Sequence, residues 1–86
     1  MASEMQTKKL ESKIQHDIIK RYEKDGWYVV KLIKTNKNGI PDLACFKNGT
    51  TIFIEVKRPG EKPRPLQEFR HEELRKKGFE VLVISE

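Results

Sequence analysis

The chain contains almost no cysteine: Cys45 is the only one in its 86 residues. A single cysteine excludes an internal disulfide and any zinc site built from cysteine ligands. Cys45 also lies within an apolar run of residues, which suits a protein kept in a reducing compartment. We therefore expect a cytoplasmic location.

Long hydrophobic runs are absent as well. No apolar segment approaches the ~20 residues that a membrane-spanning helix needs, and the first residues lack the apolar centre of a signal peptide. Histidine is also scarce, and His16 and His71 fit no metal-ligand spacing. We interpret both as solvated surface residues and predict neither as a ligand or a base.

The sequence lacks a helix-turn-helix, a zinc finger and the aromatic pattern of RNA-recognition motifs, so no element for reading bases is evident. What it has in excess is positive charge, with a formal net charge of +5. This charge indicates an anionic partner, nucleic acid first and a membrane surface second. The alternative is that the lysines only keep a small protein soluble.

Charged residues make up 36% of the chain, yet its apolar residues gather in periodic segments, which is typical of a globular protein. We expect one small domain over residues 1–86, with a frayed start at residues 1–6. A domain of this size is near the lower limit for a self-sufficient core, so association with a second copy would bury useful surface.

Apolar periodicity and chain breakers predict an α/β fold in the order α-β-β-β-α-β. The expected elements are a helix at 7–24, strands at 27–34, 42–46 and 51–57, a helix from Pro65 that ends at Gly78, and a strand at 79–84. The apolar Leu66, Phe69 and Leu74 define the second helix. Its position between two strands predicts parallel pairing and hence a mixed sheet flanked by helices. Whether both helices cover the same face stays open.

The most informative segment is a predicted hairpin around Asn48-Gly49, because Asn-Gly between apolar runs is typical of a two-residue β-turn. Counting outward from this turn pairs Asp42 with Glu55. Directly opposed residues project from the same face with Cβ atoms ~5 Å apart. The period of two then places Lys57 beside Glu55 on that face. A bulge would shift the register and separate the two acids.

Two opposed carboxylates are unfavourable unless a cation balances them, and Lys57 can neutralise only one. A hard divalent cation such as Mg²⁺, which one or two carboxylates commonly hold together with waters and phosphates, would remove the conflict. The alternative is an ordinary hairpin whose open end exposes a solvated cluster of charges. The register match and the position of Lys57 favour the metal site.

Two further polar residues have a structural and a functional interpretation. Glu11 shares the apolar stripe of the first helix with Ile14 and Ile18, but an acid in a first helical turn is also favoured by the helix dipole. Gln67 stands at the third position of the second helix, where it can reach back as a capping-box partner. Arg64 occupies the place of the usual Ser or Thr and cannot complete such a box.

Basic residues surround the predicted site. Phosphate contacts from such residues supply affinity and salt dependence rather than sequence readout. Charge runs are otherwise solvated faces. The candidate nucleic-acid contacts are Lys13 in the first helix, Lys37 in the following loop, and Arg58, Lys62 and Arg64 beyond the hairpin.

The motifs together resemble a known family. Pro41-Asp42 followed by Glu55-Val56-Lys57 resembles the PD-(D/E)XK nuclease signature. The wider pattern is similar to the virus-type replication-repair nuclease (VRR-NUC) domain and covers nearly the whole chain, as in the stand-alone versions of phages and bacteria. The matching segments are 10–15 (LESKIQ), 39–42 (GIPD), 55–60 (EVKRPG), 62–67 (KPRPLQ) and 78–81 (GFEV).

The resemblance implies a restriction-endonuclease-like fold and cleavage of DNA that depends on Mg²⁺ or Mn²⁺. By position, Asp42, Glu55 and the main-chain carbonyl of Val56 become metal ligands, and Lys57 orients or deprotonates the attacking water. Glu11 faces the metal directly or through water, and Gln67 supports the site.

Stand-alone members resemble Holliday-junction resolvases and act as homodimers. If the protein is encoded by a phage, the expected cytoplasmic location is the cytoplasm of the host. The other hypotheses are a general, flap or RNA-end nuclease of the same fold, and a non-catalytic basic module that binds nucleic acid.

Overall fold

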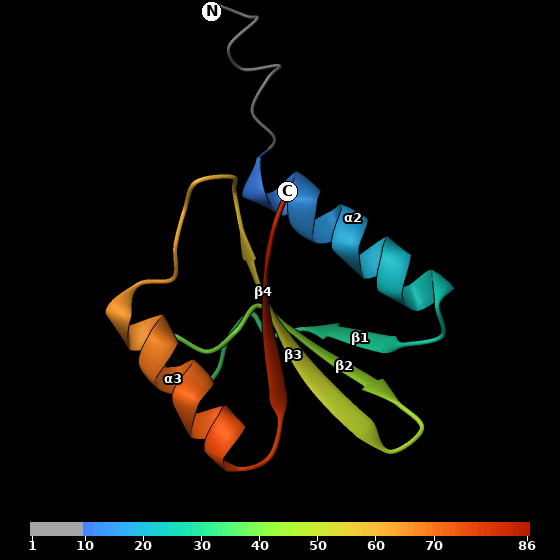
Figure 1. The fold of residues 1–86 in the computed structure, drawn as a ribbon. Coiled ribbons are helices and arrows are strands. Elements are labelled where there is room, and N and C mark those ends of the chain that lie inside the picture. The colour runs from blue at the N-terminus through green and yellow to red at the C-terminus, as the bar shows by residue number, and fades with distance from the viewer. Residues whose placement is uncertain (1–9) are drawn as a thin grey trace, which may run out of the picture.

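The computed structural model describes residues 10–86, and its elements follow the predicted order (Figure 1). The elements are α2 (Glu11–Lys24), β1 (Tyr28–Lys31), β2 (Leu43–Lys47), β3 (Thr50–Lys57), α3 (Pro65–Lys76) and β4 (Glu80–Ser85). The frayed start expected at 1–6, and residues 7–9 of the first predicted helix, lie outside the described residues. Within residues 10–86, neither helix is long and apolar enough to cross a membrane.

The four strands form one mixed sheet in the order β1-β2-β3-β4. β1 with β2 and β2 with β3 are antiparallel pairs, whereas β3 and β4 are parallel. The parallel pair confirms the prediction from the strand-helix-strand connection, since a crossover through α3 returns the chain in the same direction.

The hairpin between β2 and β3 has the predicted turn and register. Asn48 (φ 49°) and Gly49 (φ 78°) both adopt positive φ, as a type I′ turn requires. The pairs run from Lys47 with Thr50 at the turn to Leu43 with Ile54 at the far end. Because this ladder contains no extra residue, the next step outward places Asp42 across from Glu55.

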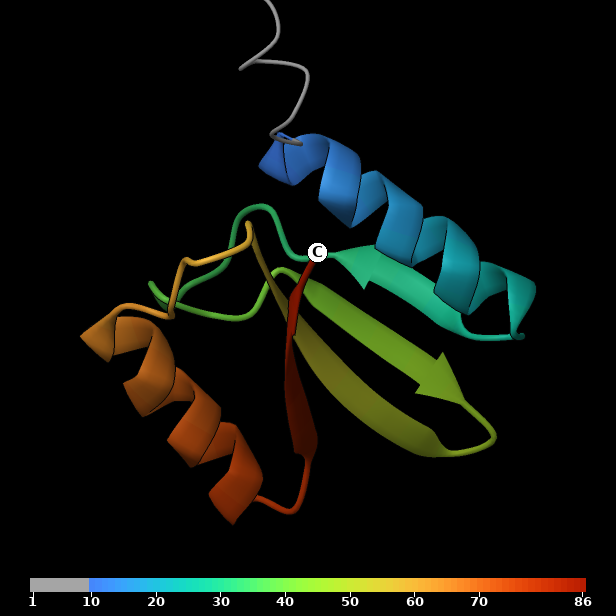
Figure 2. The ribbon, with the colours of Figure 1, turned by 45° about the horizontal axis from the view of Figure 1, so that its top comes forward.

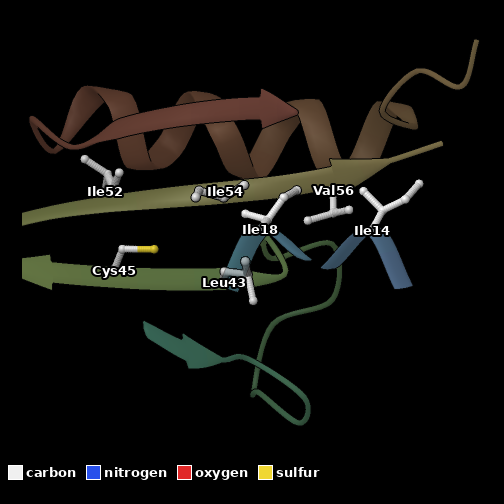
Figure 3. Packing of buried hydrophobic residues seen from close by; sticks show 7 residues of the cluster. All are labelled: Ile14, Ile18, Leu43, Cys45, Ile52, Ile54 and Val56. Carbon is white, nitrogen blue, oxygen red and sulfur yellow. The ribbon is translucent and has the colours of Figure 1, made fainter. Parts of the chain in front are cut away.

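The alternation along β3 separates the two faces of the sheet. Ile54 and Val56 belong to the buried cluster that includes Ile14 and Ile18 of α2, whereas Glu55 contacts α3. The helices therefore cover opposite faces, which the sequence left open and which Figures 1 and 2 show. Figure 3 shows the α2 side of the sheet, where the core consists of Ile14, Ile18, Leu43, Cys45, Ile52, Ile54 and Val56.

The loop between β1 and β2 is longer than predicted, because β1 ends at Lys31 rather than near residue 34. The loop contains a turn at Asn38-Gly39, and Gly39 has a φ of +82°. A Cβ on Gly39 would lie 2.8 Å from Leu66 Cγ, so only glycine fits. Arg70 donates to the Asn38 carbonyl at 2.8 Å and ties this loop to α3.

The buried face of α3 differs from the prediction. Leu66 and Phe69 are 45% and 55% exposed, whereas Gln67 and His71 are buried against the sheet. The interpretation of His71 as a solvated surface residue is wrong: its side chain is 2% exposed. The physical reason is that α3 covers the sheet face that carries the buried carboxylate of Glu55, which requires polar partners.

Candidate active site

Asp42 is anchored at the point where β2 begins. The preceding Pro41 is buried, and the main-chain oxygen of Asp42 accepts a hydrogen bond from the Leu32 N–H at 2.8 Å. Its carboxylate Oδ2 accepts another from the Val56 N–H at 2.7 Å. The side chain of Asp42 therefore lies against β3 beside Glu55.

Glu55 is almost fully enclosed, with only 1% of its surface exposed. Its Oε1 lies 3.2 Å from His71 Nε2, and its Oε2 accepts a hydrogen bond from Gln67 Nε2 at 3.3 Å. Lys57 Nζ lies 3.8 Å from the same Oε2. The structure thus brings Asp42, Glu55 and Lys57 together on one face, as the register predicts.

The crowding of charged groups changes the pKa of Glu55. Burial raises the pKa of Glu55, and the charge and hydrogen bond of the Asp42 carboxylate raise it further, to about 8. The ammonium of Lys57 opposes this shift but does not cancel it. Without a bound cation, this crowding keeps Glu55 protonated to a higher pH than an ordinary glutamate.

The remaining predicted site residues are Glu11 and Gln67. Glu11 occupies the first turn of α2, and its charge is among those that raise the pKa of Glu55. The position of Glu11 in the first turn fits the structural interpretation, and its role at a metal site stays a prediction. Gln67 makes both a capping contact and a contact with the site, since its Oε1 accepts from the Arg64 N–H at 2.8 Å while its Nε2 donates to Glu55.

The predicted nucleic-acid contacts are exposed, but two of them are engaged in ion pairs. Lys13 lies 3.2 Å from Asp17, and Arg58 lies 2.9 Å from Glu61. Exposed pairs of this kind contribute little to stability and can be exchanged for a phosphate. Lys37, Lys62 and Arg64 are also exposed.

The donor set fits a hard divalent cation. Two carboxylate groups converge, and each carboxylate has lone pairs beyond those used by its hydrogen bonds. In residues 10–86 no three His, Cys, Asp or Glu side chains form a ready-made metal-binding group. A cation held by Asp42 and Glu55 would therefore complete its coordination with main-chain oxygen, water and substrate phosphate, as Mg²⁺ commonly does.

The metal-free protein is expected to lose stability as the pH rises from 7 to 8.5. Because the pKa of Glu55 is raised above its unfolded value of 4.5, the folded state binds more protons than the unfolded state until the pH passes about 8. Unfolding by urea in EDTA should show a decrease of roughly 1 kcal/mol over this interval.

This pH window separates Glu55 from His71. Burial lowers the pKa of His71 from 6.5, so His71 makes stability rise with pH only in the more acidic range. Glu55→Gln is the control and should flatten the decrease above pH 7. If the stability of the wild type changed as little above pH 7 as that of Glu55→Gln, the raised pKa of Glu55 would be contradicted.

Comparisons with known proteins identify the family of this chain. The VRR-NUC domain family matches residues 2–85. The chain belongs to the VRR-NUC family. It is also 36% identical over 76 residues to the candidate nuclease p44 of Acyrthosiphon pisum secondary endosymbiont phage 1, a match that covers 87% of this chain and 82% of that protein.

A solved structure described as a VRR-NUC domain superimposes with a TM-score of 0.79 and 36% identity, covering 87% of this chain and 83% of the other. The fold and the family predicted from the motifs are therefore confirmed, and the chain is a nuclease domain whose substrate is a nucleic acid. The functional roles of Asp42, Glu55, Lys57, Glu11 and Gln67 stay predictions.

His71 is the residue of the site that sequence reasoning missed. One signal was available: His71 follows Gln67 by four positions, so the two share a helix face. Because the resemblance already places Gln67 at the site, the same spacing predicts His71 beside it.

Proposed function

We propose that this VRR-NUC domain is a divalent-metal-dependent DNA endonuclease that selects branched structures and resolves Holliday junctions as a homodimer. The convergence of Asp42, Glu55 and Lys57 supports the catalytic part of the proposal. A phage protein of this kind would act in the host cytoplasm.

The residues have distinct parts in the proposed hydrolysis. Asp42, Glu55 and the Val56 carbonyl would hold Mg²⁺ or Mn²⁺, with Glu11 contributing directly or through water. The bound cation supplies Lewis acidity at the scissile phosphodiester. Lys57, beside Glu55, would orient the attacking water or take its proton, and Gln67 keeps Glu55 in place.

Exposed apolar side chains support the homodimer. Four of them lie on α3, on β4 and at the residue that precedes β4, and each has at least 40% of its surface exposed: Leu66, Phe69, Phe79 and Val83. Large apolar side chains left exposed to solvent are a kind of surface that a second copy of the chain can cover. Two copies related by a two-fold axis would present two active sites to a junction of similar symmetry.

A cleavage assay tests the preferred substrate, and sedimentation of the same protein tests the dimer. The purified chain is incubated with a four-way junction, a flap, a linear duplex and a single-stranded RNA, each with Mg²⁺, Mn²⁺ or EDTA. We expect paired nicks in the junction and no product in EDTA, and sedimentation at twice the 10.1 kDa chain mass. Equal cleavage of every substrate would favour a general nuclease. Salt-sensitive binding without product would favour the non-catalytic module.

The basic loop after β3 is expected to control affinity for DNA. Replacing Lys62 and Arg64 together by alanine should weaken junction binding and reduce the slope of log K against log salt by about 2, because each lost phosphate contact removes ~0.9. Fluorescence anisotropy in EDTA measures both effects without cleavage.

A matched control keeps the net charge the same. Lys76 and Lys77, exposed at the far end of α3, are replaced by alanine in the control protein. The salt slope of this control should stay close to that of the wild type. An equal loss of affinity in both double variants would mean that only total charge matters.

A further inference from the structure

Glu55 is held by two side chains from a single helix. Gln67 Nε2 donates to Oε2 at 3.3 Å, and His71 Nε2 lies 3.2 Å from Oε1. Because residues 67 and 71 are four positions apart, both project from the same face of α3. Each oxygen of the carboxylate therefore has its own partner on this helix. The two contacts together fix the plane of the carboxylate from the side of α3.

The ionisation state of Glu55 determines which atom donates the hydrogen bond in its contact with His71. An ionised carboxylate can only accept hydrogen bonds, so His71 must carry its proton on Nε2 to contact an ionised Glu55. A neutral imidazole orients the carboxylate without cancelling its charge. Lys57, by contrast, offsets that charge. The negative charge of Glu55 stays available for a cation while its orientation is kept.

We infer that His71 is a positioning residue that orients the Glu55 carboxylate through an Nε2–H hydrogen bond. The consequence for metal binding rests on the proposed function, in which Glu55 is a metal ligand. Partners that hydrogen-bond a ligating group from behind commonly contribute roughly 10- to 100-fold to metal affinity or activity. His71 would affect binding of the cation without touching it.

A purely structural role would have different consequences. The imidazole is 2% exposed and fills space between α3 and the sheet. Leucine at this position would fill similar space but donate nothing, whereas glutamine keeps an N–H donor. Comparing His71→Leu with His71→Gln therefore separates the donor from the packing. Leu74→Ala, which truncates a half-buried side chain on the same helix, is the control for loosened packing of α3.

The experiment titrates each protein with Mn²⁺ in the absence of DNA, using electron paramagnetic resonance, and records its melting temperature. His71→Leu should weaken Mn²⁺ binding about 10-fold or more, and His71→Gln less than about 3-fold. Leu74→Ala should lower the melting temperature with little change in Mn²⁺ affinity. Wild-type affinity in His71→Leu, or an equal loss in His71→Gln, would overturn the inference.

A second readout needs no metal. In the metal-free protein at pH 9, above the pKa of Glu55, nitrogen NMR of the His71 ring should show the Nε2–H tautomer. The Nδ1–H tautomer would overturn the inference whatever the Mn²⁺ titration gives. If the wild type binds no Mn²⁺, the proposed metal site fails, and the tautomer still decides whether His71 holds Glu55.

Discussion

Asp42→Ala is expected to reduce metal-dependent cleavage by on the order of 10³-fold, since losing several kcal/mol of Lewis-acid stabilisation costs a factor of ten for each ~1.4 kcal/mol. The carboxylate of Asp42 lies against β3 through its bond to the Val56 N–H and shares the site with Glu55. Its removal takes away one of the carboxylates that hold the cation in the proposed site. Initial rates on a four-way junction with Mg²⁺ measure the loss.

Binding should respond differently from cleavage. The basic residues that contact phosphate are unchanged in Asp42→Ala, so junction affinity in EDTA is expected to stay near that of the wild type. The control is Asp25→Ala, which removes an exposed acid near the turn end of the hairpin, where Asp25 lies 3.7 Å from Lys47. If Asp42→Ala cleaves as fast as Asp25→Ala, the assignment of the active site is wrong.

The second large effect concerns Lys57. Lys57→Met keeps the aliphatic part of a side chain that is 9% exposed but removes the ammonium 3.8 Å from Glu55. Turnover should fall roughly 10²- to 10⁴-fold, the range for loss of a positioned general base. Mn²⁺ affinity should not weaken, because the substitution removes a positive charge that repels the cation.

The effect of Lys57→Met on the chemical step can be measured separately from its effect on metal binding. Single-turnover rates at saturating protein report the chemical step, and Mn²⁺ titration reports the metal site. Lys47→Met, which alters a lysine at the turn end of the same hairpin, is the control and should cleave normally. A Lys57→Met protein that loses Mn²⁺ affinity along with activity would indicate that Lys57 is structural.

The part of the site on the hairpin could be predicted because its geometry is local. A two-residue turn at Asn48-Gly49 determines the whole register, and the register determines that Asp42 meets Glu55. No tertiary information enters this argument. The parallel pairing of β3 with β4 follows in the same way from the connection through α3.

The part of the site contributed by α3 depends on tertiary packing and could not be derived from periodicity. Apolar positions predict which face of a helix is buried when the surface below is apolar. Here the surface below includes the carboxylate of Glu55, so Gln67 and His71 face it while Leu66 and Phe69 remain exposed. Glu11 lies on the helix that covers the opposite face of the sheet, and its charge still contributes to the raised pKa of Glu55.

The most direct measurement of the central claim is a crystal structure of the protein soaked in Mn²⁺, with anomalous diffraction data that locate the ion independently of the protein. The account predicts an anomalous peak within coordination distance of one carboxylate oxygen of Asp42 and one of Glu55. A fully loaded crystal with Mn²⁺ only at other positions, and none between these two acids, would contradict it.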